Sequence, residues 1–590
     1  MRLKQILLLT ALLLSCRTHA QKQDRPNVIF ILTDDQGWGD LAFHENPHIN
    51  TPAIDQIAKR SVRLTNYFVS PVCAPTRASL MTGRYSLRTG VRDTYNGGAI
   101  MSSDEITLAE ILGDAGYKTA IFGKWHMGDN YPARPKDQGF QESLVHMAGG
   151  IGQPGDYLNF HKGDSSYFNP TLLHNGVPEQ TQGYCSDVYT DAAIHYIESQ
   201  KDHPFFIYLS FNAPHAPLQL PQEYYDIFKE IDPSEGFPAL MQPAMSEKDK
   251  EDARKVYGMV HNIDDNIERL MSVLKELHLD KRTLVVFSTD NGPAQKRYIG
   301  GMRGKKGTVY QGGIKVPCFF HFPSKFPEGK RVDFPTMHID ILPTIVSLCG
   351  ATIPSDRKID GMDLLPYFLS ENQLEAPPER ALFFYWHRRS IEKYHNIAIR
   401  QGDYKLVGNS EYNAPVHEFE LFRIDRDFNE QQNLVIDQPQ KAAQMKTELD
   451  HWYDEMIQEP NMLNFSRAIV GTAFENPVVL NRNDAFGPEA IWKSDEIFAY
   501  WEIKVAEAGY YNLKFKFSAP LAKGGIMKIQ LGPVHYTLKN EIAGQQELEM
   551  KELFLPAIEG QFMPWYRYRS AGAVHNTLPF TIEIRRTNLI

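Results

Sequence analysis

The chain has 590 residues, of which 42% are hydrophobic and 23% are charged, and its formal net charge is −10. Because this length exceeds what one hydrophobic core usually supports, we expect two or three folded domains. The negative charge, without a long basic run, argues against nucleic acid as the main partner. It also means that an anionic ligand needs its own local cluster of cations.

The N-terminus has the pattern of an export signal. Arg2 and Lys4 precede a short apolar run, Ile6–Leu14, which is too short to cross a bilayer. Cleavage after Ala20 gives a periplasmic or secreted protein, whereas lipidation of Cys16 gives a membrane-anchored bacterial lipoprotein. Both alternatives predict export.

The remaining cysteines are few for an exported chain. Cys318 and Cys349 lie in apolar contexts and are predicted to be buried thiols, and Cys185 is the third. No disulfide framework is implied.

The first predicted strand is the apolar, β-branched run Asn27–Leu32, typical of a strand covered on both faces of a sheet. It is followed by Asp34 and Asp35. Ligands of open α/β sheets bind at the carboxyl ends of central strands, and two adjacent buried carboxylates need a cation. The alternative is a pair of solvated turn residues.

Residues 73–84 read C-A-P-T-R-A-S-L-M-T-G-R, with a cysteine before a predicted helix. Free N–H groups and the dipole at a helix N-terminus favour negative charge, so Cys73 is a candidate nucleophile. The alternative is a buried cysteine in a proline turn.

A helix over residues 107–115 with a Thr107–Glu110 capping box, then a strand over 118–122, forms one repeat of a doubly wound sheet. The strand runs into G-K-W-H, where Lys124 and His126 alternate and are predicted to point to one side of an extended segment. On their own, such residues are usually at the surface.

Two further buried-type strands also end in polar residues. Residues 205–209 lead to His215, which two prolines hold in a stiff loop. Residues 284–287 lead to Asp290 and Asn291, although an Asp-Asn-Gly turn alone would carry no ligand. The helical pattern over 256–277 predicts a packing helix whose acidic pair, Asp264 and Asp265, is solvated or capping.

After residue 300 the alternation of buried strands and helices gives way to other patterns. Residues 302–317 form a glycine-rich basic loop. Residues 398–407 and 420–424 are typical of antiparallel strands, and a helix follows near 441–456. The last 125 residues or so alternate apolar and polar positions like a β-sandwich, in which Trp565 and Tyr566 are candidate sugar-stacking side chains; simple packing against the first domain is the alternative.

Together these motifs resemble the formylglycine-dependent (type I, arylsulfatase-like) sulfatases of the alkaline phosphatase superfamily. The resemblance rests on C-x-P-S-R with T-G-R, D-D-x-G, G-K-W-H, A-P-H-x-P, D-N-G and R-G-x-K-G-T-x-Y-E-G-G-x-R-V-P, and covers roughly residues 25–458. Two positions depart from it: Thr76 replaces the usual serine and keeps its hydroxyl, and Gln311 replaces a glutamate.

The resemblance implies the chemistry of the site. Cys73 would be converted to Cα-formylglycine by a formylglycine-generating or radical maturase, and its hydrate would be the nucleophile. The other implied catalytic residues are Arg77, His126 and His215; the sulfate-binding residues are Lys124 and Lys306, the latter rather than Lys305. The implied metal ligands are Asp34, Asp35, residue 73, Asp290 and Asn291. Such hard oxygen donors select Ca²⁺, with Mg²⁺ second.

The fold implied is α/β: a large mixed, mostly parallel sheet sandwiched by helices, a small antiparallel-sheet subdomain and an appended β-sandwich. We expect a signal peptide over 1–20, a catalytic domain over 21–348, the subdomain over 349–465 and the accessory domain over 466–590. The predicted function is hydrolysis of sulfate monoesters on a sulfated, algal-type polysaccharide or its oligosaccharides. The alternatives are a phosphodiesterase or phosphonate hydrolase using the same aldehyde, and a glycan-binding protein without catalysis.

Overall fold

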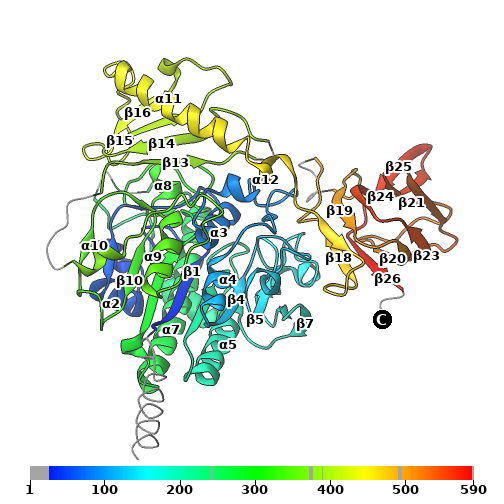
Figure 1. Ribbon diagram of the computed structural model, residues 1–590, viewed down its shortest axis with the longest axis horizontal. Coiled ribbons are helices and arrows are strands. Elements are labelled where there is room, and N and C mark those ends of the chain that lie inside the picture. Colours follow the sequence, from blue (N-terminus) through cyan, green and yellow to red (C-terminus); the bar gives the residue numbers. More distant parts are fainter. Residues whose placement is uncertain are drawn as a thin grey trace, which may run out of the picture.

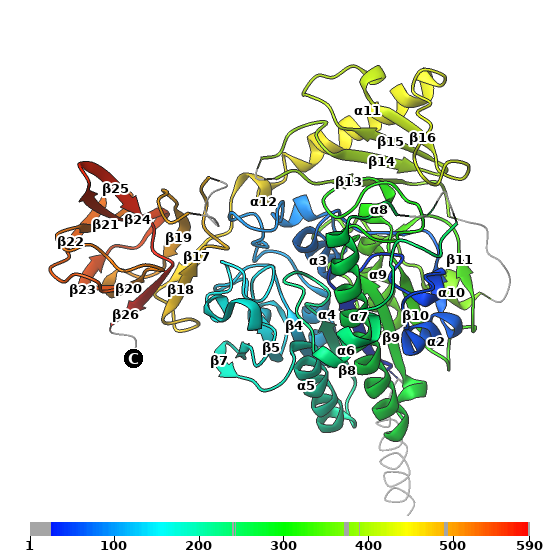
Figure 2. The same ribbon diagram turned by 180° about the vertical axis from the view of Figure 1, so that it is seen from behind.

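The computed structural model describes residues 25–238, 241, 243–370, 377–388, 390–488 and 494–587 (Figures 1 and 2). The predicted export signal, with Cys16, lies outside the described residues. Within these ranges no helix is long and apolar enough to cross a membrane. No disulfide joins the described cysteines. Cys318 and Cys349 are buried thiols as predicted, and Cys185 is buried as well.

A ten-stranded mixed sheet forms the centre of the largest domain, in the order β11-β2-β10-β9-β1-β8-β4-β5-β6-β7. Its four middle strands run parallel, so their carboxyl ends meet at one edge. This confirms the predicted α/β class. The strands are β1 (Asn27–Thr33), β2 (Val62–Leu64), β4 (Lys118–Lys124), β5 (Glu142–His146), β6 (Thr171–His174), β7 (Val177–Gln180), β8 (Phe205–Ser210), β9 (Thr283–Thr289), β10 (Cys318–His321) and β11 (Arg331–Val332).

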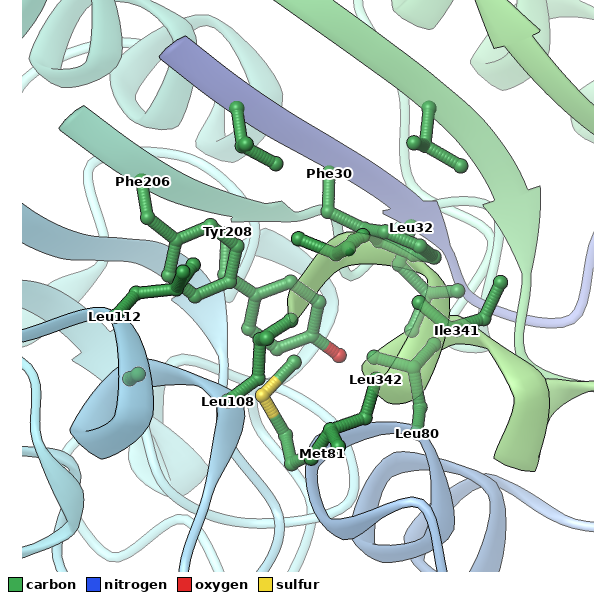
Figure 3. Close-up of a cluster of buried hydrophobic side chains, with 14 of the residues drawn as sticks. Phe30, Leu32, Leu80, Met81, Leu108, Leu112, Phe206, Tyr208, Ile341 and Leu342 are labelled. Atoms are coloured by element: carbon green, nitrogen blue, oxygen red, sulfur yellow. The ribbon is translucent and has the colours of Figure 1, made fainter. Parts of the chain in front are cut away.

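Helices cover both faces of this sheet. One face packs against α3 (Cys73–Thr82), α4 (Leu108–Asp114) and α9 (Ile341–Leu348), as Figure 3 shows for side chains of these helices against Phe30 and Tyr208. The other face packs against α2 (Pro52–Arg60), α5 (Cys185–Gln200) and α7 (Glu247–Glu276). Because α3 lies between the sheet and two other helices, every residue of it is buried.

Two local predictions can be compared with these helices. The Thr107–Glu110 capping box is present at the start of α4. Capping was one of the two predicted roles of Asp264. The residue lies in α7 but caps α2, because its carboxylate accepts the backbone N–H groups of Ala53 and Ile54 in the first turn of that helix. A helix N-terminus has unpaired N–H donors, which explains why this carboxylate is buried.

Leu342 on α9 belongs to the hydrophobic cluster between the helices of this face and the sheet, so its replacement tests that packing. Its side chain is fully buried, and replacing it with alanine leaves a cavity in this cluster. We expect Leu342→Ala to lower the free energy of unfolding by about 2–5 kcal/mol, measured by urea denaturation. The matched control is Leu463→Ala, since Leu463 is 68% exposed and its removal should change stability by less than about 0.5 kcal/mol. Equal effects of the two substitutions would contradict this packing.

A four-stranded antiparallel sheet follows in the chain, with β13 (Ala381–Tyr385), β14 (Ile397–Gln401), β15 (Tyr404–Gly408) and β16 (Glu420–Arg423) in sequential order. Helix α11 (Pro439–Met456) packs along it, and both lie above the carboxyl edge of the large sheet in Figure 1. These elements match the strands and helix predicted for this segment.

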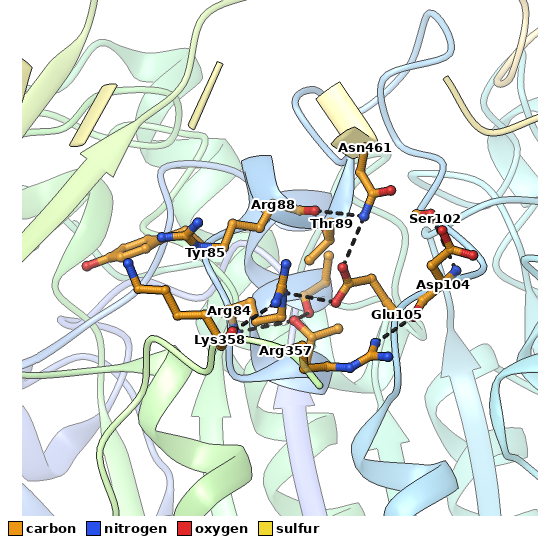
Figure 4. Close-up of polar contacts among 12 residues, drawn as sticks. Arg84, Tyr85, Arg88, Thr89, Ser102, Asp104, Glu105, Arg357, Lys358 and Asn461 are labelled. Atoms are coloured by element: carbon orange, nitrogen blue, oxygen red, sulfur yellow. Dashed lines mark hydrogen bonds and ion pairs between the residues drawn. The ribbon is translucent and has the colours of Figure 1, made fainter. Parts of the chain in front are cut away.

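Ion pairs and hydrogen bonds of Arg88 tie this subdomain to the segment that follows α3; Figure 4 draws the hydrogen bond between Arg88 and Asn461. Arg88 pairs with Asp360, Glu455 and Glu459. Asn461, in the short helix α12 (Pro460–Leu463), donates to the carbonyl of Arg88 and to Glu105. The network therefore holds the segment that follows α3 against the end of α11 and against α12.

Glu105 of this network is expected to make stability pH-dependent. Arg84 Nε lies 3.2 Å from Glu105 Oε2, in an ion pair without hydrogen-bond geometry. Burial outweighs this partner and raises the pKa of Glu105 to about 7. The folded chain therefore keeps a proton that the unfolded chain releases near its ordinary pKa of 4.5, so the unfolding free energy falls as pH rises from about 4.5 to about 7.

The measurement is urea denaturation of wild type and Glu105→Gln at about pH 5 and about pH 8. The glutamine cannot ionise, so the difference in unfolding free energy between the two pH values should be smaller in the variant by about 3 kcal/mol. A variant with an unchanged pH dependence would show that Glu105 is ionised in the folded protein.

The C-terminal segment forms two facing sheets that are antiparallel except for the parallel pair β17 and β19. One contains β17 (Ala468–Val470), β19 (Trp501–Val505), β21 (Ile526–Leu531), β22 (Val534–Lys539), β24 (Ile558–Ser570) and β25 (Ala573–Thr577). The other contains β18 (Val478–Asn481), β20 (Gly509–Lys516), β23 (Glu547–Leu555) and β26 (Thr581–Arg586). One aromatic prediction is wrong: Tyr566 is fully buried between the sheets, so it offers no face to a sugar.

Candidate active site

Cys73 is the first residue of α3 and lies at the carboxyl edge of the large sheet. Only 2% of its surface is exposed, and burial raises the pKa of its thiol. The unmodified side chain is therefore a protonated thiol at neutral pH, which is a weak nucleophile.

Four oxygen-bearing residues meet beside Cys73. Because β1 and β9 pair with Thr33 opposite Thr289, the residues that follow these strands lie side by side: Asp34 and Asp35 after β1, and Asp290 and Asn291 after β9. Ligand atoms of Asp34, Cys73 and Asp290 all lie within 4.8 Å of one another. Asn291 also donates to Asp35 at 2.7 Å.

This cluster fits a hard divalent cation. Asp34 Oδ1 and Asn291 Oδ1 are buried without a hydrogen-bond partner, so two oxygens are available as ligands. Burial, with the nearby Asp290 carboxylate, raises the pKa of Asp34 to about 8. A cation would relieve this cost, and carboxylate and amide oxygens are the ligands that Ca²⁺ and Mg²⁺ prefer.

Three cationic side chains complete the cluster. Lys124 Nζ lies 2.7 Å from Asp34, and Lys306 Nζ lies 2.5 Å from Asp35. The Arg77 guanidinium donates to Asp290 at 2.8 Å and to the hydroxyl of Ser210. The local group of cations that an anionic ligand requires is thus present, and Lys306 rather than the exposed Lys305 belongs to it.

His126 takes a different backbone shape from the predicted extended segment. Its φ is +62°, because the chain turns sharply after β4, and the ring points towards Thr94. His126 Nε2 lies 2.6 Å from the carbonyl oxygen of Thr94, which assigns the proton to Nε2. Nδ1 is buried without a partner and is available as a proton acceptor.

His215 lies on the loop after β8 and lines the same cavity as His126. Its Nδ1 lies 2.6 Å from the carbonyl oxygen of Ala216, so Nδ1 carries the proton and Nε2 faces Asp35 at 3.8 Å. Burial and the Lys306 ammonium lower the pKa of His215 to about 3, which keeps the ring neutral in the absence of an anionic ligand.

A cavity of about 290 Å³ opens onto these groups. It is lined by Val72, Cys73, Thr94, Tyr95, His126, Gly149, Gln153, His215, Lys306 and Arg388. The sequence motifs missed Thr94, Tyr95, Gln153 and Arg388, which come from loops without a recognisable pattern. Arg388 lies over the Tyr95 ring at 4.7 Å and donates to Asp93, so it places a further positive charge at the wall of the cavity.

Comparison with known proteins gives matches over most of the chain. The family described as Sulfatase matches residues 26–351, and the family described as N-sulphoglucosamine sulphohydrolase, C-terminal, matches residues 304–459. N-acetylgalactosamine-6-sulfatase of Sus scrofa is 30% identical over 445 residues, covering 69% of this chain and 76% of that protein. The enzyme of the same name from Homo sapiens is 31% identical over 396 residues, covering 61% and 68%.

Two solved structures are also similar. Ps i-CgsB in complex with k-i-k-neocarrahexaose is 29% identical, with a TM-score of 0.62, and the match covers 74% of this chain and 94% of that one. The phosphonate monoester hydrolase of Agrobacterium radiobacter is 20% identical, with a TM-score of 0.56 over 73% and 96% of the two chains. The second likeness shows the fold alone.

Proposed function

The chain belongs to the sulfatase family and is a sulfuric ester hydrolase, and from this premise we propose that it removes sulfate from a sulfated polysaccharide, of algal type, or from its oligosaccharides. The observation that carries the proposal is one cavity lined by Cys73, Lys306 and two histidines, with Lys124 buried beside it on Asp34. The names of its relatives support a glycan substrate: N-acetylgalactosamine-6-sulfatases and a protein solved with a neocarrahexaose. On the N-terminal pattern, we further propose that the enzyme is exported.

Cys73 in this proposal is converted to Cα-formylglycine by a maturase, and the hydrate supplies the nucleophilic hydroxyl. The raised pKa of the buried thiol supports this, since an unmodified thiol would be largely protonated. Asp34, Asp35, Asp290, Asn291 and residue 73 would hold Ca²⁺, or Mg²⁺ as second choice, whose charge would stabilise the sulfuryl oxygens.

The chain's own cations bind and orient the sulfate group. Lys124 and Lys306 now contact the carboxylates of Asp34 and Asp35, and a bound cation would release them towards the sulfuryl oxygens. Each well-placed donor of this kind contributes roughly 10²–10³ in rate. Arg77 holds Asp290 and thereby the end of β9 in position.

The two histidines move protons. His215 Nε2 faces the cluster, and a bound anion would neutralise the field of Lys306 and raise the pKa of the ring, which allows it to protonate the leaving oxygen. His126 Nδ1, which lacks a partner, would accept the proton of the hydrate's second hydroxyl as the C–O bond to sulfate breaks and the aldehyde forms again.

The test combines a mass measurement with a substrate screen. Protein from a host with a maturase should give a Cys73 peptide whose mass corresponds to conversion of the thiol into an aldehyde. The same preparation should release inorganic sulfate from carrageenan or glycosaminoglycan oligosaccharides faster than it cleaves a phosphate diester. A modified peptide without sulfate release from any of these glycans would contradict the glycan substrate, and an unmodified, active protein would contradict formylglycine.

A further inference from the structure

The joint between the large domain and the β-sandwich contains two buried carboxylates. Asp129 lies on the loop after β4, three residues beyond His126, and is 8% exposed. Asp484 lies on the loop after β18 and is 6% exposed. The backbone N–H of Asp129 donates to Asp484 Oδ2 at 3.2 Å, so the two residues are direct neighbours across the joint.

A closed ring of hydrogen bonds connects these carboxylates through two asparagines. Asn481 Nδ2 donates to Asp129 Oδ2 at 2.5 Å, and Asn481 Oδ1 accepts the N–H of Asn483 at 2.7 Å. Asn483 Nδ2 donates to Asp484 Oδ1 at 3.2 Å. Two oxygens of this ring have no donor although they are buried, namely Asp129 Oδ1 and Asn483 Oδ1, and Asn483 is fully buried.

The described part of the chain supplies no positive charge to this pair. Burial, followed by the Asp484 carboxylate, raises the pKa of Asp129 well above its usual range, and burial raises the pKa of Asp484 to about 6. By contrast, Glu475 at the same joint lies 3.4 Å from Arg134. Among the described residues these two buried carboxylates have no counterion, which is costly, so a proton or a cation would stabilise the joint.

We propose that Asp129 and Asp484 bind a divalent cation of the Ca²⁺ type, with Asn483 Oδ1 as a neutral ligand. A shared proton would satisfy the carboxylates but leave Asn483 Oδ1 without a partner, whereas a cation uses both donor-less oxygens. A cavity of about 420 Å³, lined in part by Asn130, Leu480 and Asp484, adjoins the pair and has room for coordinating water. Calcium accepts such mixed sets of carboxylate, amide and water oxygens.

The ion would stabilise the wall of the active site from outside. The loop after β18 continues to Phe486, whose ring packs so closely on Gly97 that a Cβ there would lie 2.3 Å from it. Gly487 exchanges two hydrogen bonds with Asn96. Both contacts are made by the two residues that follow Tyr95, which lines the active-site cavity. The β-sandwich therefore supports that cavity.

The test is calcium stoichiometry of the full chain, measured by equilibrium dialysis and elemental analysis. The double variant Asp129→Asn/Asp484→Asn should bind one equivalent fewer than wild type, because it lacks both charges. The control is Asp156→Asn: this buried carboxylate already accepts hydrogen bonds on both oxygens, so its loss should leave the stoichiometry unchanged. Calcium stoichiometry is measured without substrate turnover, so the result is independent of the proposed function.

A milder variant covers the case in which the double variant does not fold. Asn483→Ala removes one neutral ligand and should weaken calcium binding at one site by roughly tenfold while the other site keeps its affinity. Equal calcium binding by wild type and these variants would overturn the proposal and leave a shared proton as the explanation. A loss of the same equivalent in Asp156→Asn would overturn the ligand set.

Discussion

Replacement of Cys73 by alanine is expected to abolish sulfate release, lowering kcat by at least about 10⁴-fold. The residue lies at the first position of α3, within 4.8 Å of the ligand atoms of Asp34 and Asp290, and no other described cysteine comes near this cluster. Without it the cavity keeps its cations and should still bind an anion, but it lacks the proposed nucleophile. The measurement is sulfate released from a sulfated oligosaccharide, quantified by ion chromatography.

The matched control is Cys349→Ala, which removes a buried thiol at the end of α9. It should cost some stability but leave kcat within about twofold, because this thiol is remote from the cavity. The Cys73→Ala protein should still bind substrate, with a KM or a dissociation constant close to that of wild type. Residual turnover above about 1% in Cys73→Ala would show that the nucleophile lies elsewhere.

The carboxyl edge of the sheet was predictable because parallel strands repeat one geometry. β1, β4, β8 and β9 are adjacent, so residues at the end of each strand or in the loop that follows it converge. Asp34, Lys124, His215 and Asp290 are separated by up to 256 positions in the chain. The apolar runs before them indicated neighbouring strand ends, and the resemblance to the family's motifs then placed the four residues in one site.

The remaining wall of the cavity was not predictable in this way. Tyr95, Gln153 and Arg388 come from loops whose shapes depend on tertiary contacts rather than on local periodicity. Arg388 reaches the cavity because its guanidinium lies over Tyr95 and donates to Asp93, a contact between segments almost 300 residues apart. The structure brings His126 to the predicted cluster, but the predicted extended backbone is wrong, since a positive φ leaves no signal in a K-W-H pattern.

The C-terminal module shows the same limit. Alternating apolar residues predicted strands, but the alternation does not say which aromatic residues face inwards, and Tyr566 is part of the core. Nor does it show that Tyr95 of the large domain packs into the same hydrophobic cluster as β18 and β20. Contacts between domains join surfaces that each domain's own sequence pattern treats as exposed.

Replacement of His215 by alanine is expected to affect substrates according to their leaving groups. A sugar alcohol is a poor leaving group and needs a proton as the S–O bond breaks, so kcat/KM on a sulfated sugar should fall by about 10²–10⁴-fold. 4-Nitrophenolate leaves without a proton, so kcat/KM on 4-nitrophenyl sulfate should fall by less than about tenfold. Initial rates on the two substrates give the ratio directly.

Lys306→Ala is the control that separates proton transfer from charge neutralisation. Its ammonium lies 2.5 Å from Asp35 in the same cluster, but its proposed role is to hold the sulfuryl oxygens, which are the same in every substrate. Both substrates should therefore lose roughly 10²–10³-fold in that variant. If His215→Ala instead reduced both substrates equally, the imidazole would act on the sulfuryl group and not on the leaving oxygen. Nε2 faces Asp35 and the cavity, while Nδ1 is held by a backbone carbonyl, so only one ring nitrogen is available for either role.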